Sequence, residues 1–312
     1  EFMFRHKIPT ARYRIFNKKN IHEASAFLNT LNPPYVLKAD GLAAGKGVLI
    51  LTDLNEAKKS LDNMILKKKF GQASERVVIE EYLKGIEVSS FVLTDGDTYK
   101  IFPMAKDYKR IGIGDTGLNT GGMGAISPVP FVDKELYHKI ESQVIRPTIN
   151  GLKKDKIDYI GFLFIGLMIV GNEPYVIEYN VRLGDPETEA ILPRIESDLL
   201  EIFLQLKSSR LQTSNLKVSE LFSSTVMTVS KGYPEKYEKG KIISGLDCKS
   251  DSFLFHSGTK KENQNTVTSG GRVIAVTSTD KLLKKAIEKS YKTISKINFE
   301  GKTFREDIGF DL

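Results

Sequence analysis

The sequence predicts an α+β protein built from more than one domain. Its 312 residues are enough for two or three domains with cores of their own. Short β-branched apolar runs, such as residues 48–51 and 88–93, occur beside a segment with helical spacing of apolar residues at 55–69. A polar stretch at residues 207–217 then separates a further set of strands and a helix from the preceding elements, as a linker would.

The first block, residues 17–94, is expected to hold short strands around one helix. The helix is expected at residues 55–69, because four apolar residues recur there at helical spacing: Ala57, Leu61, Met64 and Ile65. Strands are expected at residues 35–39, 48–51, 77–81 and 88–93. Residues 1–16 read as the remnant of a preceding region or a linker.

The second block, residues 95–212, carries a long Gly-rich loop at residues 110–124 between its strands and helices. Its expected strands are residues 98–103, 162–170 and 175–180, and its helices are residues 134–153 and 198–207. A Gly-Asn turn should join the last two strands as a hairpin. The third block, residues 218–312, is expected to contain strands at 224–229, 253–257 and 273–276, followed by a helix at 281–297.

Composition excludes several classes of protein. The net charge of +7 comes from lysines spread over expected helices rather than from an Arg-rich arm, so nucleic acid is not the expected partner. The longest apolar run, residues 162–170, is far too short to cross a bilayer. The single cysteine, Cys248, excludes an internal disulfide and fits a reducing compartment. We therefore expect a cytoplasmic protein whose basic surface attracts anionic metabolites.

The strand expected at residues 175–180 ends in two oxygen-bearing side chains. Because alternate side chains of a strand share a face, Glu178 and Asn180 should point the same way, while Tyr175, Ile177 and Tyr179 pack on the other side. Such a pair suits a hard cation that nucleotide phosphates also hold. The alternative is an ordinary strand whose polar face meets water.

The segment Gly41-Leu-Ala-Ala-Gly-Lys-Gly47 resembles a phosphate-binding loop. It is not a Walker A sequence, because its spacing is one residue short and no Ser or Thr follows Lys46. The apolar run that follows predicts a strand where a Walker loop would open a helix. Backbone N–H groups of such a small-residue turn can close over phosphates, with Lys38 and Lys46 adding charge. The alternative is a plain Gly-rich turn.

The segment Val77-Val-Ile-Glu-Glu-Tyr-Leu-Lys-Gly-Ile-Glu87 reads as a strand, a short connector and a second strand. Backbone groups of the connector could read an adenine edge, and Glu87 could reach ribose hydroxyls. A hinge between two lobes with acidic surface residues explains the same pattern equally well.

Two further patterns lie near the Gly-rich loop. Gly112-Ile-Gly-Asp-Thr-Gly117 matches a dinucleotide fingerprint by letter, but charged residues precede it and no helix follows, so a flexible substrate-covering loop is the better interpretation. Asp107-Tyr-Lys-Arg110 offers either a functional cationic cluster or a solvated charge run. Covalent nucleophilic catalysis is not expected, since no Ser-His-Asp or Cys-His arrangement can be assembled.

Together these motifs resemble the ATP-grasp carboxylate–amine ligases, and most closely the phosphoribosylamine–glycine ligases. The resemblance covers the chain almost from end to end and keeps the family's order. It rests on Ile8-Pro-Thr-Ala11, Lys38-Ala-Asp-Gly-Leu-Ala-Ala-Gly-Lys-Gly-Val48, Ile79-Glu-Glu-Tyr-Leu83, Asp107-Tyr-Lys-Arg110, Asp115-Thr-Gly-Leu-Asn-Thr-Gly-Gly-Met-Gly-Ala125, Arg182-Leu-Gly-Asp-Pro-Glu187, His256-Ser-Gly-Thr259 and Gly270-Gly-Arg-Val273.

The resemblance implies two lobes that clamp ATP and a C-terminal α+β domain. It also implies ATP-dependent joining of glycine to 5-phosphoribosylamine through glycyl phosphate, with Mg²⁺ or Mn²⁺. In these terms Glu178 and Asn180 bind the metal. The residues expected to contact ATP are Lys38, Gly45, Lys46, Glu80, Glu81, Leu83 and Glu87. Those expected to serve catalysis or to position the acceptor substrates are Lys38, Arg182, Asp185 and Arg272, with Asp185 for an ammonium group and Arg272 for an anionic one.

Two departures from the family pattern matter. Ala105-Lys106 stands where the family commonly has Ser-Gln, which adds a charge near the expected phosphate site. The family also begins with a domain that helps to bind phosphoribosylamine and that this sequence does not include. The chain is therefore expected to bind nucleotide as a fragment and to make glycinamide ribonucleotide poorly or not at all.

Two other functions stay open. One is an ATP-grasp ligase with a different carboxylate and amine, and the other is a nucleotide-binding module without turnover. The presence of both Glu178 and Asn180 argues against the second. The expected partners are small molecules only, and a monomer is expected.

Overall fold

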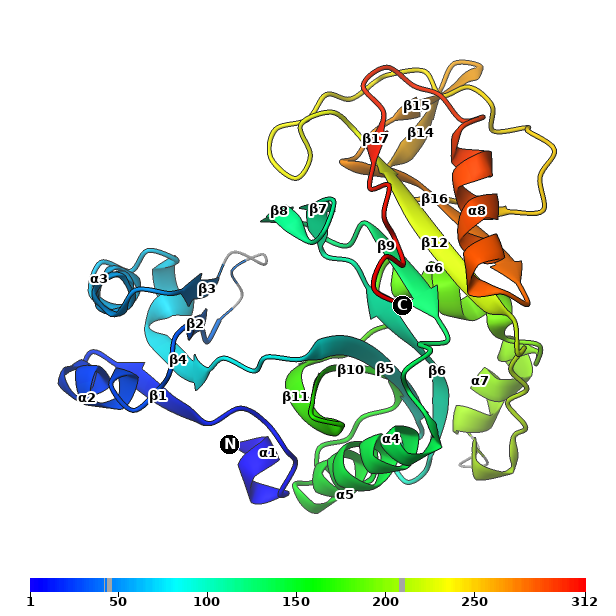
Figure 1. The fold of residues 1–312 in the computed structure, drawn as a ribbon. Coiled ribbons are helices and arrows are strands. Elements are labelled where there is room, and N and C mark those ends of the chain that lie inside the picture. The colour runs from blue at the N-terminus through cyan, green and yellow to red at the C-terminus, as the bar shows by residue number, and fades with distance from the viewer. Residues whose placement is uncertain (42, 44–46, 208–210) are drawn as a thin grey trace. The chain divides into compact units, whose positions relative to one another are not determined.

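The computed structural model describes residues 1–41, 43, 47–207 and 211–312. The chain forms two compact units (Figure 1). The smaller unit is Pro9–Gly85, and the larger unit combines Glu1–Ile8 with Ile86–Leu312. No helix in these described ranges is long and apolar enough to cross a membrane.

The smaller unit is an antiparallel sheet with helices packed on it. The strand order is β1-β4-β2-β3, with bounds β1 Tyr13–Asn17, β2 Tyr35–Ala39, β3 Val48–Leu51 and β4 Arg76–Glu81. The helical segments are η1 Ile21–Glu23, α2 Ala24–Leu28, α3 Leu54–Ile65 and η2 Gly71–Ser74. Buried Phe16, Leu37 and Ile79 of the sheet pack against Leu28 and Met64 of the helices. This packing gives the unit a hydrophobic core of its own.

Helix α3 begins one residue before the predicted start and ends four residues before the predicted end. The Asp53 side chain caps it by accepting a hydrogen bond from the Glu56 N–H at 2.7 Å. Its buried residues are those expected from the spacing: Ala57, Leu61, Met64 and Ile65. The expected end at residue 69 is wrong, because Lys68 adopts a positive φ of 49° that no α-helix contains.

The larger unit is built on one long sheet of antiparallel pairs in the order β11-β10-β5-β6-β9-β12-β16-β13, with β17 beside β12. The strands are β5 Ile86–Thr94, β6 Tyr99–Asp107, β9 Gly124–Ser127, β10 Gly161–Val170, β11 Glu173–Asn180, β12 Phe222–Val229, β13 Phe253–His256, β16 Arg272–Asp280 and β17 Thr303–Phe304. Strand β5 pairs with β6 and β10. The segment 86–94, expected in the first lobe, therefore lies in the larger unit.

Strand β6 continues beyond the expected end at residue 103. Pro103 cannot donate a ladder hydrogen bond. In the structure the register between β5 and β6 shifts at this point, so that Phe91 pairs with Phe102 and Ser89 with Ala105. The bulge accommodates the proline and lets the strand run on to Asp107.

Both faces of β10 are buried, which explains its continuous apolar sequence. Leu163, Ile165 and Leu167 pack with residues of α4 Lys134–Lys139, the π-helical segment η3 Ile140–Ile145 and α5 Arg146–Lys154. On the opposite face Phe164 packs in a second cluster that includes residues of α6 Glu187–Ile191 and α7 Leu199–Lys207. Figure 1 shows α4 and α5 on one side of β10 and β5.

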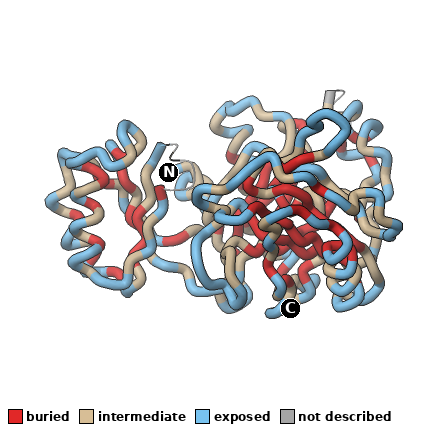
Figure 2. Tube along the Cα trace, turned by 90° about the horizontal axis from the view of Figure 1, so that it is seen from above, coloured by how far each residue is buried: buried red, intermediate tan, exposed pale blue. Residues whose placement is uncertain are grey.

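The C-terminal part of the chain extends the same sheet. Strand β9 pairs with both β6 and β12, so the segments expected as separate domains at 95–212 and 218–312 share one ladder. Helix α8 Leu283–Ile294 covers β12 and β16, and its Ile294 packs with Val226 and Ile274. Figure 2 shows the buried residues gathered in the interior and the exposed residues on the outer turns of the chain.

Short hairpins complete the larger unit. Gly171 and Asn172 both adopt positive φ, of 56° and 66°, and join β10 to β11 by the tight turn that the sequence predicts. The Gly-rich loop contains a second hairpin, β7 Arg110–Gly112 paired with β8 Thr116–Asn119, and β14 Thr259–Glu262 pairs with β15 Asn265–Thr268. The remaining short helical segments are α1 Phe2–Arg5, η4 Leu192–Arg194 and η5 Leu211–Thr213.

Candidate active site

The end of β11 presents Glu178 and Asn180 beyond a β-bulge. Gly166 of β10 pairs with Glu178, but its neighbour Leu167 pairs with Val176, so Ile177 is the extra residue. Alternation is therefore interrupted: Val176 is completely buried, whereas Glu178 is exposed. The expectation that Tyr175 and Ile177 form the packed face is wrong for this reason.

Tyr179 follows the expectation, since its ring packs in the core and its hydroxyl lies 2.7 Å from the Thr148 hydroxyl. Gly166 leaves space for the Glu178 side chain, because a Cβ there would lie 3.0 Å from its Cγ.

Lys109 lies next to this strand end. Its ammonium group forms an ion pair with Glu87, at the start of β5. Burial alone would lower the pKa of Lys109, but the carboxylates of Glu87 and Asp107 outweigh it and raise that pKa, with a further contribution from Glu178. Lys109 therefore stays charged at neutral pH and provides a cation beside the expected metal ligands.

Asp107 and Glu187 form an acidic pair on the inner side of Lys109. Burial and then the charge of Glu187 raise the pKa of Asp107, and burial also raises the pKa of Glu187. The Ser89 hydroxyl donates a hydrogen bond to Glu187 at 2.8 Å. Asp107 Oδ1 is buried and has no hydrogen-bond partner among the described residues. The site therefore contains a buried carboxyl oxygen that can still form a hydrogen bond with a bound molecule.

The glycines of two sequence motifs allow close packing around this pair. A Cβ on Gly122, which has a φ of 112°, would lie 2.3 Å from Pro186 Cδ and 2.8 Å from Asp107 Oδ1. A Cβ on Gly184 would lie 2.4 Å from a carboxylate oxygen of Glu187. The Asn-Thr-Gly-Gly and Arg-Leu-Gly-Asp-Pro-Glu strings thus pack directly against each other.

Arg272, at the start of β16, joins this region to the C-terminal part of the sheet. Its Nη2 lies 2.9 Å from Asp185 Oδ2, and its Nη1 donates to the carbonyl oxygens of Gly121 at 2.6 Å and Asp185 at 2.8 Å. Asp185 and Arg272, expected to bind separate substrate groups, are therefore paired with each other. Arg182 lies apart from this pair, exposed, and donates to the Leu183 carbonyl.

A pocket of about 400 Å³ opens beside the Arg272–Asp185 pair. Its walls bring residues 256–258 and 270–272 together with Asp185 and Glu189, which lie more than 60 positions earlier in the sequence. Gly258 and Gly270 are needed where these segments meet, because a Cβ on Gly258 would lie 2.7 Å from the Gly270 Cα. The pocket is lined by Asp185, Glu189, His256, Ser257, Gly258, Gly270 and Arg272. Its charged groups of both signs suit a small polar ligand.

Glu189, which sequence reasoning did not single out, should make stability depend on pH. Burial and the nearby Asp185 charge raise its pKa from 4.5 to about 7. Between these values the folded chain holds a proton that the unfolded chain releases, so stability falls as pH rises through this window. In the Glu189→Gln variant the side chain is neutral at every pH, so the variant does not lose this stability as pH rises. Relative to the parent, its free energy of unfolding should rise by about 1–2 kcal/mol from pH 5 to pH 8, the partial exposure reducing the full effect.

Urea unfolding at several pH values measures this difference. Parallel stability profiles for the parent and Glu189→Gln would show that Glu189 titrates normally in the folded chain.

Three of the residues expected to contact ATP in the smaller unit already have polar partners there: Lys38, Glu80 and Glu81. Lys38 Nζ lies 2.6 Å from Glu80 Oε2, across neighbouring strands β2 and β4. Glu81 accepts a hydrogen bond from the Arg12 N–H at 2.7 Å, and Leu83 is half-buried in the connector that leaves β4. Gly45 and Lys46 lie outside the described residues.

The structure brings the expected metal ligands to one strand end without completing a cage. Across the described residues, no group of three or more His, Cys, Asp or Glu side chains could hold a metal ion. A carboxylate and an amide oxygen still fit Mg²⁺, which commonly binds through one or two protein oxygens together with substrate phosphates and water.

Comparison with protein families places the chain. The ATP-grasp (A) domain of phosphoribosylglycinamide synthetase matches residues 1–188, and the C domain of the same enzyme matches residues 223–311. The chain belongs to the phosphoribosylglycinamide synthetase family. Its fold is accordingly the ATP-grasp fold, an α+β architecture, as the sequence predicts.

Curated relatives support this family membership over nearly the whole chain. Phosphoribosylamine–glycine ligase of Chlorobaculum tepidum is 45% identical over 313 residues, covering 99% of this chain and 73% of that protein. The ligase of the same name from Fusobacterium nucleatum is 41% identical with the same coverage. The trifunctional purine biosynthetic protein adenosine-3 of Gallus gallus is 42% identical, and the match covers 99% of this chain and 31% of that protein.

Solved structures support the same family and fold. The crystal structure of phosphoribosylamine–glycine ligase from Thermotoga maritima has a TM-score of 0.90 and 36% identity, covering 98% of this chain and 76% of that one. Biotin carboxylase from Campylobacter jejuni has a TM-score of 0.73 at 14% identity, covering 97% of this chain and 66% of that one, so it shares the fold.

Lys106 belongs to the Ala105-Lys106 pair that departs from the pattern of the phosphoribosylglycinamide synthetase family. Its side chain is buried, and its Nζ lies 3.0 Å from Asp311 Oδ2 and 4.0 Å from the centre of the Tyr108 ring. The carboxylate of Asp311 therefore balances the charge that the sequence adds here. Members of the family use ATP with a divalent metal and act on small-molecule substrates.

Proposed function

We propose that this chain is a C–N bond-forming ligase that joins glycine to 5-phosphoribosylamine, giving glycinamide ribonucleotide, ADP and phosphate. The observation that carries the proposal is the combination, in one compact unit, of the Glu178–Asn180 strand end with the pocket beside Arg272 and Asp185. The strand end suits the phosphates and their metal, and the pocket suits the acceptor substrates. Family membership over 99% of the chain supports the same assignment.

The reaction needs two displacements and no protein nucleophile. An oxygen of the glycine carboxylate attacks the γ-phosphorus of ATP, and the bond to the bridging oxygen breaks to give glycyl phosphate and ADP. The amine of phosphoribosylamine then attacks the glycyl carbonyl carbon, phosphate leaves, and the amide nitrogen loses a proton. Catalysis of this kind comes from positioning and from charge stabilisation in a site that excludes water.

Glu178 and Asn180 would hold Mg²⁺ or Mn²⁺ through their side-chain oxygens. When bound, the metal would neutralise charge on the β- and γ-phosphates of ATP. Glu178 also contributes to the raised pKa of Lys109, so a permanent cation lies near the same place. Lys109 is therefore suited to stabilise phosphoryl oxygens, with Glu87 fixing its direction.

The remaining residues position ATP and the acceptor substrates in this proposal. Lys38 would contact ATP phosphates once its ion pair with Glu80 opens, and Glu81 and Leu83 would frame the adenine through the backbone of the connector. Asp185 would hold the glycine ammonium group, and Arg272 would hold an anionic group of the acceptor while keeping Asp185 in place. Arg182 would contact the acceptor side from the exposed edge of the site.

An ADP-release assay with single substrates omitted tests the function. We expect slow release, in keeping with the poor synthesis expected from the sequence, that needs ATP, a divalent metal, glycine and phosphoribosylamine together. Mass spectrometry should identify glycinamide ribonucleotide as the product. Release that persists when another amino acid replaces glycine would point to a different carboxylate–amine ligase. ATP binding without ADP release under any of these conditions would point to a nucleotide-binding module and overturn the proposal.

A further inference from the structure

The segment Arg305–Asp311, called here the latch segment, packs against Lys106–Lys109, the extended segment at and just beyond the end of β6. Alternate residues of an extended chain face opposite sides. Asp107 and Lys109 face the acidic site, where their charges act on each other. Lys106 and Tyr108 face the latch segment: Lys106 pairs with Asp311, and the Tyr108 hydroxyl donates to Asp311 Oδ1 at 2.9 Å. The latch segment therefore supports one side of residues 106–109, and the other side of these residues faces the site.

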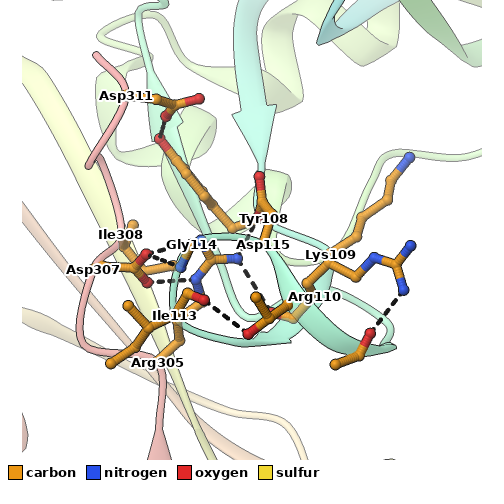
Figure 3. Close-up of polar contacts among 12 residues, drawn as sticks. Tyr108, Lys109, Arg110, Ile113, Gly114, Asp115, Arg305, Asp307, Ile308 and Asp311 are labelled. Atoms are coloured by element: carbon orange, nitrogen blue, oxygen red, sulfur yellow. Dashed lines mark hydrogen bonds and ion pairs between the residues drawn. The ribbon is translucent and has the colours of Figure 1, made fainter.

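Arg305 forms the centre of this contact. Its side chain is completely buried, yet its guanidinium has partners in every direction (Figure 3). Nη1 lies 2.5 Å from Asp115 Oδ1, and Nε lies 2.5 Å from Asp307 Oδ1. Nη1 also donates to the Arg110 carbonyl at 3.2 Å, and the group lies 5.2 Å from the centre of the Tyr108 ring. A lysine could not reproduce this planar fork.

The latch segment also fixes the tip of the β7–β8 hairpin. Asp307 Oδ2 accepts a hydrogen bond from the Gly114 N–H at 2.7 Å, as Figure 3 shows. Hydrogen bonds from Arg305 and Gly114 outweigh burial and lower the pKa of Asp307, so its carboxylate stays ionised. Ile111 packs against the core at the base of the hairpin, whereas Ile113 is 60% exposed and Leu118 is 50% exposed, so the tip has little other apolar support.

We propose that the latch segment positions Asp107, Lys109 and the β7–β8 hairpin for ligation, which makes Arg305 a positioning residue of the reaction. This inference rests on the proposed ligase function for its kinetic readout. Arg305 contacts neither the Glu87–Lys109 pair nor the Arg272–Asp185 pair through any of its hydrogen bonds or ion pairs in the described structure. Its influence passes through Arg110, Asp115 and Tyr108.

Arg305→Lys tests the proposal in the full chain. Because Ile308 stays buried in the core, the latch segment should remain docked while the fork is lost. We expect kcat to fall by about 10- to 100-fold with KM for ATP within about twofold, because small misplacement of reacting groups slows chemistry more than it weakens substrate binding. The matched control is Arg5→Lys, which alters another Arg–Asp pair of the same unit, at 2.6 Å from Asp155. That control should match the parent.

Hydrogen exchange at the Gly114 amide gives a readout that does not depend on activity. Arg305→Lys should speed this exchange by at least about tenfold, and Arg5→Lys should not. If the parent shows no ligase activity, the proposed function fails, and the exchange result alone decides whether the latch orders the hairpin. Unchanged exchange, or a kcat per folded molecule within about twofold of the parent, would overturn the proposal.

A second variant guards against poor folding of Arg305→Lys. Asp115→Asn keeps the pair between Arg305 and Asp307 and removes only the charge on the hairpin. This variant should also lower kcat and speed exchange at the Gly114 amide, but by smaller factors than Arg305→Lys. Exchange and kcat both equal to those of the parent would count against the proposal.

Discussion

Glu178→Gln is expected to reduce glycine- and phosphoribosylamine-dependent ADP release by about 1,000-fold or more. The substitution keeps the size of the side chain and removes the carboxylate charge from the end of β11. Loss of the metal's stabilisation of developing charge is worth several kcal/mol, and each 1.4 kcal/mol is a factor of about ten in rate. The metal concentration needed for half-maximal ATP binding should rise as well, because one of two protein ligands is weakened.

Glu173→Gln is the matched control, because Glu173 begins the same strand and pairs with Lys139 instead. It should leave both the rate and the metal requirement unchanged. Isothermal titration with ATP at varied Mg²⁺ and steady-state kinetics measure the two effects. Undiminished metal-dependent ATP binding in Glu178→Gln would remove Glu178 from the ligand set.

Arg272→Lys is expected to lower kcat/KM for the acceptor substrates by about 100-fold. The lysine would keep a positive charge but lose the hydrogen bonds to the carbonyl oxygens of Gly121 and Asp185. Removing one partner of a well-bonded charge pair costs about 2–5 kcal/mol, part of which is the penalty for the group left behind. KM for ATP should change little, since these contacts lie in the pocket rather than at the strand end.

Arg146→Lys tests whether any Arg-to-Lys change has this effect. Arg146 forms an exposed pair with Glu141 at 3.6 Å, so its replacement should be silent. An equal loss of kcat/KM in both variants, or a change confined to KM for ATP in Arg272→Lys, would contradict the assignment of Arg272 to the acceptor side.

The sequence was sufficient to predict those elements whose conformation depends only on neighbouring residues. The Gly171–Asn172 turn, the Asp53-capped helix and the continuous apolar run of β10 each follow from backbone preference or from spacing. The Glu178–Asn180 pair could be singled out for the same reason. Strand alternation did not reveal the bulge at Ile177, because a bulge depends on the partner strand.

Other features depend on contacts between distant segments. The sequence left Asp107-Tyr-Lys-Arg110 as either a cationic cluster or a solvated charge run. In the structure Asp107 is a buried acid and Lys109 is paired with Glu87. The sequence prediction ended this strand at residue 103, so it did not place Asp107 at the end of β6. The pairing of Arg272 with Asp185 joins residues far apart in sequence, so spacing could assign them only to separate substrate groups.

The pairing of β9 with β12 has a consequence for how this unit comes apart. The ladder runs without a break from β11 to β13, so neither half possesses a sheet edge of its own at that junction. Cleavage between residues 188 and 222 would therefore not release an independent domain. Separating the halves would expose the unpaired backbone N–H and C=O groups of two strand edges, and such edges promote aggregation by pairing with other chains. The part that carries Glu178 and Asn180 and the part that carries Arg272 should therefore unfold together, as one cooperative unit.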